Sequence, residues 1–165
     1  MVDQHRLQIL ERGLTSRLLI WGIGGTVVGS ALWVAGGRSG HREMLRFGRQ
    51  TALWGATDAV IALAGIRDRR RRGELSDAEV HAKARRLRTL LLVNAAADVV
   101  YVAGGVRVLS RTIGGASTSQ DDSSAGHGRT YLGMGAGDGL AIVIQGGFLL
   151  VLDTVYALRV RRARD

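Results

Sequence analysis

The stretch LLLVNAAADVVYVAGG, from Leu90 to Gly105, decides the fold class of this chain. It is apolar almost throughout, yet Asn94, Asp98 and Tyr101 lie inside it at spacings of four and three residues. A helix that is apolar nearly all round is typical of a membrane span, because a soluble amphipathic helix keeps a charged opposite face. Residues at these spacings share one side of a helix, so the stretch predicts a transmembrane helix with one polar face.

Three further apolar blocks alternate with segments rich in arginine. This segregation explains why the mean hydropathy of the 165-residue chain is only +0.09 although 46% of its residues are hydrophobic. The second block is the shortest, and it reaches the ~17–25 residues that a span needs only if Arg46 and Arg49 extend their guanidinium groups to the interface. We expect one all-α domain over residues 1–165, a four-transmembrane-helix bundle with short interfacial helices. The predicted spans cover about residues 18–37, 47–66, 89–106 and 139–158.

The basic residues are distributed unevenly between the two sides of the predicted bundle. With four spans, most of the 23 Lys and Arg residues fall on the side that holds both termini. The positive-inside rule therefore predicts a multi-pass protein of the cell membrane with both termini in the cytoplasm. This placement also accounts for the net charge of +9, so the expected partner is the lipid bilayer rather than a nucleic acid. A basic soluble nucleic-acid binder is the minor alternative.

Residues 1–17 carry apolar side chains at helical spacing among polar ones. Leu7, Ile9, Leu10 and Leu14 can face lipid if the segment forms a short amphipathic helix on the membrane surface. The pattern fits a polar leader without membrane contact equally well.

The segment between the second and third spans carries a helix start signal and two basic clusters. Ser76 followed by Glu79 forms a capping box, which predicts a short helix over Asp77–Arg88 that leads into the third span. The clusters Arg67–Arg72 and Lys83–Arg88 can bind anionic lipid head groups, at ~1 kcal/mol for each residue near the surface. They can also act only as determinants of topology.

Small residues predict close helix packing, and aromatic residues mark the ends of the first span. Trp21 and Trp33 lie where interfacial aromatic side chains are expected. Glycine lets two helix backbones approach closely, within the chain, in a homo-oligomer or against a partner membrane protein. The predicted packing glycines are Gly25 and Gly29, which form a GxxxG pair, with Gly146 and Gly147.

Polar residues deep in the predicted spans form the candidate site. Asp58 and Asp98 both fall near the middle of a span, where a charge costs ~2.5 kcal/mol or more. Each carboxyl must therefore be protonated or partnered, and is expected to face protein rather than lipid. The predicted polar seam comprises Asp58, Asn94, Asp98, Tyr101, Gln145 and Asp153.

Two interpretations of this seam remain open. It can be a proton, cation or small-ligand site, including one in a transport component. A shift of 40 residues superposes Asp58 on Asp98, as in inverted repeats of transporters, and chance explains so short a match equally well. It can instead supply only interhelical hydrogen bonds, worth ~0.6–2 kcal/mol each, in a structural or accessory subunit that packs against partner membrane proteins.

The sequence offers few residues in arrangements typical of catalytic sites. The chain has no cysteine, and its four histidines fall outside the predicted spans, so thiolate chemistry and paired histidine ligands inside the bundle are not expected. Asp121, Asp122 and His127 can hold a cation in a polar loop, but such residues more often contact water. We expect no enzyme activity, no catalytic residue, no metal and no cofactor.

Two motifs in the third and fourth spans resemble those of a known family. They are Asn94, Asp98, Tyr101, Gly104 and Gly105, and Gln145-Gly146-Gly147-Phe148 followed by Asp153. From about Met44 to Ala157 the chain resembles small four-helix bacterial integral membrane proteins of unknown function. Members of that family usually have Trp followed by Asn residues in the second span, whereas Gly55, Thr57 and Asp58 follow Trp54 here. The resemblance implies a four-span membrane fold and no particular activity.

Overall fold

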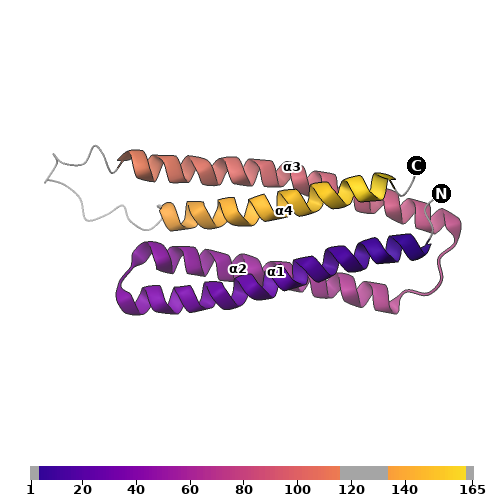
Figure 1. Cartoon of the computed structure of the whole chain (residues 1–165), viewed down its shortest axis with the longest axis horizontal. Coiled ribbons are helices and arrows are strands. Elements are labelled where there is room, and N and C mark those ends of the chain that lie inside the picture. The colour runs from indigo at the N-terminus through magenta and orange to yellow at the C-terminus, as the bar shows by residue number, and fades with distance from the viewer. Residues whose placement is uncertain (1–3, 116–133, 163–165) are drawn as a thin grey trace, which may run out of the picture.

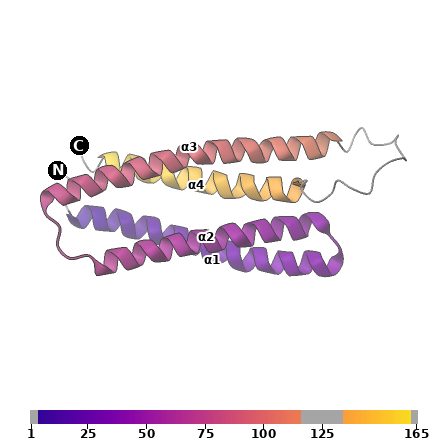
Figure 2. The ribbon, with the colours of Figure 1, turned by 180° about the vertical axis from the view of Figure 1, so that it is seen from behind.

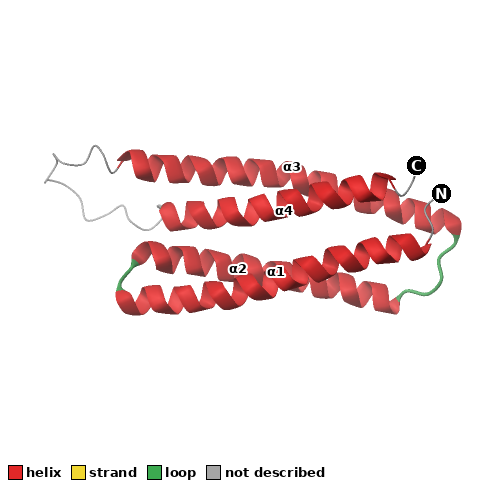
Figure 3. Cartoon of the chain, in the orientation of Figure 1, coloured by secondary structure: helices red, strands yellow, loops and turns green. Residues whose placement is uncertain are grey.

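The computed structural model describes residues 4–115 and 134–162, and every regular element in these ranges is a helix. Figure 3 shows this all-helical architecture, which confirms the predicted all-α class. The candidate cation loop with Asp121, Asp122 and His127 lies outside the described residues. The four helices are α1 (Gln4–Ser39), α2 (Arg42–Arg71), α3 (Asp77–Gly115) and α4 (Ala136–Arg162).

The helices form two antiparallel hairpins, α1 with α2 and α3 with α4, and both views show the hairpins side by side (Figures 1 and 2). The hairpins meet mainly through α2 and α4. The start of α1 and the end of α4 lie at one end of the bundle, together with the connection from α2 to α3. At the opposite end Gly40, whose φ of 72° lies in the left-handed region that glycine tolerates, reverses the chain between α1 and α2.

Three of the four helices are long and apolar enough to cross a membrane, namely α1, α3 and α4. Helix α2 is not among them, so the prediction of four such helices is met by three. The cause is local, because Arg49 and Arg67 bound the apolar part of α2 and Asp58 interrupts it. Residues 47–66 nevertheless lie inside one continuous helix.

Glycines hold α1 and α2 together at short range. Gly22, Gly29 and Gly36 recur every seven residues, which returns them to one face of α1. A Cβ at Gly29 would lie 2.8 Å from the Cα of Ala52, and a Cβ at Gly25 would lie 3.3 Å from the Cα of Gly55. The two glycines of the predicted GxxxG pair, Gly25 and Gly29, therefore lie against α2 of the same chain.

Helices α3 and α4 also approach through glycines. A Cβ at Gly105 would lie 3.0 Å from the carbonyl oxygen of Gly139, and one at Gly146 would lie 3.0 Å from Cγ2 of Val102. Gly146 therefore packs against α3. At Gly147, by contrast, an added Cβ would meet no described atom within 4 Å.

The predicted interfacial helices are not separate elements. Residues from Gln4 onward belong to α1, whose first turns pack against α3 and α4. Leu7 is only 2% exposed in a cluster with Val80 and Val160, so it does not face lipid as one of the two interpretations of residues 1–17 would require. The helix predicted from Asp77 is confirmed as the start of α3, where the backbone N–H of Ser76 donates to Glu79 Oε2 at 2.8 Å.

Candidate binding cavity

All six predicted seam residues line one cavity between the two hairpins. Its volume is about 380 Å³. Helix α2 contributes Asp58, and α4 contributes Gln145 and Asp153. Helix α3 contributes Asn94, Asp98 and Tyr101, which the helical period places on one side as expected.

The six side chains divide into a buried group and a rim. The three aspartates and Gln145 are buried. Asn94 is exposed, and Tyr101 is 48% exposed. Asn94 lies within hydrogen-bonding reach of Asp153. The ring of Tyr101 meets that of Trp54 edge-on at 5.5 Å between centroids.

Two consecutive hydrogen bonds hold Gln145 in place beside the cavity. The indole Nε1–H of Trp21 donates to Gln145 Oε1 at 2.9 Å, and Gln145 Nε2 donates to Asp58 Oδ2. Because an indole nitrogen only donates, the Gln145 amide must turn its oxygen to Trp21 and its nitrogen to Asp58. These two hydrogen bonds link α1, α4 and α2.

The contacts of Trp21 beside the cavity were not revealed by the sequence. Trp21 was expected at the membrane interface, but its ring stacks on Phe148 with centroids 3.9 Å apart. Both rings line a second cavity of about 490 Å³ between α1, α2 and α4, and Gln145 borders both cavities. The only available signal was the position of Trp21 a few residues inside the predicted span.

Asp98 is the unsatisfied group of the cavity. It is 8% exposed, and its Oδ2 atom has no hydrogen-bond partner among the described residues. Asp58 and Asp153 lie close enough for their charges to interact with that of Asp98. No Lys, Arg or His is among the described residues that line the cavity, and none of the described ion pairs includes these three acids.

The cavity opens sideways between α2 and α3. These two helices do not pack against each other among the described residues, and the Trp54–Tyr101 ring contact bridges the gap. Leu90 and Ile61, which also line the cavity, are at least half exposed. The mouth therefore lies on the apolar side of the bundle rather than at its ends.

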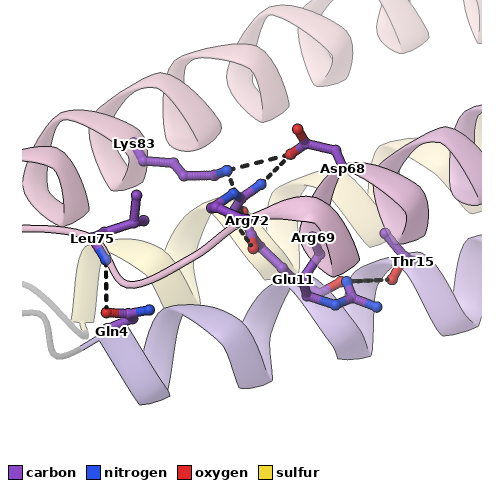
Figure 4. Close-up of polar contacts among 8 residues, drawn as sticks. All are labelled: Gln4, Glu11, Thr15, Asp68, Arg69, Arg72, Leu75 and Lys83. Carbon is purple, nitrogen blue, oxygen red and sulfur yellow. Dashed lines mark hydrogen bonds and ion pairs between the residues drawn. The ribbon is translucent and has the colours of Figure 1, made fainter.

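A charge cluster closes the end of the bundle at which α1 begins (Figure 4). Arg72 Nη1 donates to Glu11 Oε2 at 3.0 Å, and Lys83 Nζ lies 3.6 Å from Glu11 Oε1. Burial raises the pKa of Glu11 above its usual 4.5, and the Arg72 charge only partly opposes this rise. Asp68 pairs with both cations.

Some of the basic residues that were predicted to contact lipid head groups have partners inside the protein instead. Arg72 and Lys83 are engaged with acids, and Arg69 Nη1 donates to Thr15 Oγ1 at 3.1 Å. Within the two predicted basic clusters, the exposed arginines are Arg67, Arg70, Arg71, Arg85 and Arg86.

At the opposite end, one acid of α2 and one of α4 cap the start of α4. Glu43 Oε2 accepts the backbone N–H of Gly137 at 2.6 Å, and Asp138 Oδ2 accepts that of Gly135 at 3.0 Å. Free N–H groups in the first turn of a helix need such acceptors. Both ends of the bundle are thus tied by polar contacts, and the cavity lies between them.

Comparison with known proteins gives a family and no activity. The model of a family of unknown function (DUF6992) matches residues 17–154, which include every residue of the polar seam. No curated protein and no solved structure matches the chain.

Proposed function

Since this chain belongs to a family of unknown function, DUF6992, we propose its function from its own geometry. It is a four-span protein of the cell membrane that binds a proton, a cation or a small ligand in the polar cavity between its hairpins. The proposed activity is binding, with no catalysis.

The packing of α2 supports four spans. Gly55 and Gly48 lie against the stretch of α1 from Gly22 to Trp33, so α2 runs at the same depth as the apolar part of α1. If α1 crosses the bilayer, α2 crosses it too. Several large apolar side chains of α2 point outward, where lipid can cover them: Leu53, Val60, Ile61 and Leu63.

The distribution of arginine supports cytoplasmic termini. The end of the bundle that holds the start of α1 and the end of α4 also holds Arg67–Arg72 and Lys83–Arg88. This is the side that the positive-inside rule assigns to the cytoplasm. There the exposed arginines contact anionic lipid head groups.

The unpartnered carboxyl of Asp98 carries the proposal. Burying a carboxyl oxygen without a partner costs free energy, and inside a membrane this cost is rarely retained without a use. Interhelical hydrogen bonding alone does not explain Asp98, because its Oδ2 atom makes no such bond among the described residues. A bound proton or cation satisfies the group.

The glycine ridges favour binding over the accessory-subunit alternative. Docking through a ridge on α1 needs glycines that face outward. Gly22, Gly29 and Gly36 are instead buried against α2, so a homo-oligomer or partner complex would have to use another face.

Carboxyl-sensitive infrared difference spectroscopy in lipid tests the proposed function. We expect the wild-type protein to give a carboxyl signal that changes with pH or with added cation, and Asp98→Asn to lose it. Glu74→Gln is the matched control, since Glu74 is an exposed acid outside the bundle. Identical difference spectra for wild type and Asp98→Asn would remove Asp98 from the function.

A further inference from the structure

We propose that the ligand of the cavity is a lipophilic organic cation, an ammonium group carried on an apolar body. This inference rests on the proposed function and specifies its ligand class.

The charge of the cavity selects a cation. Asp58, Asp98 and Asp153 face it, and no basic side chain is among the lining residues that the structure describes. Asp58 receives a hydrogen bond from Gln145, and Asp153 has Asn94 within reach, but both of these donors are neutral. An anionic ligand would add repulsion to a site whose own acids already lack counter-charges.

The spacing of the acids disfavours a small metal ion. A bound divalent ion needs several oxygen ligands at ~2.0–2.6 Å, which brings the ligating carboxylates close together. Among the described residues no group of three or more acids or histidines is arranged to hold a metal ion. A volume of about 380 Å³ suits an organic molecule instead.

The apolar lining of the cavity and the position of its mouth favour a ligand with an apolar body. Leucine and isoleucine side chains from all four helices line the cavity: Leu14, Leu18, Ile61, Leu91, Ile142 and Leu149. At the rim, Trp54 and Tyr101 offer aromatic rings that attract an ammonium group. Because the mouth opens between α2 and α3 towards the proposed lipid phase, a ligand that partitions into the bilayer reaches it directly.

The test is calorimetric titration of the full chain in lipid nanodiscs with 2-phenylethylammonium, with empty nanodiscs as the blank for partitioning. The neutral isostere 2-phenylethanol has nearly the same shape and no charge. We expect the ammonium to bind at least about tenfold more tightly than the alcohol, the ratio that one charge-assisted hydrogen bond supplies. Asp98→Asn should remove this preference, and Asp98→Glu should restore part of it.

Equal binding of the ammonium and the alcohol, or no binding of either above the blank, would overturn the inference. The comparison uses the wild-type protein, so it holds even if an Asp98 variant fails to fold. If the infrared signal of Asp98 responds to protons or Na⁺ while the ammonium shows no preference, the proposed function stands and only the ligand class fails. If neither response is found, both fail.

Discussion

Replacing Gly29 by alanine is expected to destabilise the bundle by about 1–3 kcal/mol, the usual cost of overpacking. The added Cβ would lie 2.8 Å from the Cα of Ala52. Neither atom can rotate away, because the Cα belongs to a helix backbone and the Cβ is bonded directly to one, so α1 and α2 must separate. The change is measurable as a loss of unfolding free energy in an SDS titration of the detergent-solubilised protein.

Gly24→Ala is the matched control for this experiment. Gly24 lies in the same helix, but an added Cβ there meets no described atom within 4 Å. Alanine is the better helix former by roughly 1 kcal/mol, so Gly24→Ala should be neutral or stabilising. Equal losses in both variants would contradict the packing of α1 on α2 through Gly29.

Replacing Gln145 by leucine is expected to cost about 1–3 kcal/mol, because two interhelical hydrogen bonds worth roughly 0.6–2 kcal/mol each are lost. Leucine has a similar volume, but it leaves the indole N–H of Trp21 and Oδ2 of Asp58 without their partner. The same unfolding titration measures the loss, and the fluorescence of Trp21 should shift as its hydrogen bond disappears.

Trp21→Phe removes only one of these two bonds and keeps an aromatic ring against Phe148. Combined with Gln145→Leu, it should cost less than the sum of the two single changes, because both remove the same bond. Strict additivity would show that Trp21 and Gln145 do not interact, and would contradict the hydrogen-bond chain.

The polar seam could be predicted from sequence because it depends on local periodicity. Asn94, Asp98 and Tyr101 share a side of any helix that contains them. That these side chains meet Asp58 follows from the cost of leaving carboxyls in lipid. The single cavity that all six seam residues line agrees with this reasoning.

The partners within the bundle could not be predicted, because they depend on which helices become neighbours. Apolar periodicity alone did not distinguish a lipid-facing Leu7 from one buried against Val80. In the same way, Trp21 has an interfacial position in the sequence, yet the approach of α4 turns it onto Phe148. The GxxxG pattern also drew attention to Gly25 and Gly29, whereas the closest α1–α2 contacts are made by Gly22, Gly29 and Gly36, which recur every seven residues.

Helix α2 decides whether the cavity lies inside a membrane, since it supplies Asp58 and one side of the mouth but falls short of the other helices in apolar character. Its two ends can be located independently. The chain contains no cysteine, so a single introduced thiol reacts alone. Ser39 and Glu74 are exposed positions that flank α2 at opposite ends of the bundle.

The most direct measurement is labelling of Ser39→Cys and Glu74→Cys in intact cells with a membrane-impermeant maleimide. If α2 crosses the bilayer with cytoplasmic termini, Ser39→Cys is labelled from outside and Glu74→Cys only after permeabilisation. Labelling of both from the same side would mean that α2 does not cross, and would contradict a four-span bundle with a polar cavity within the membrane.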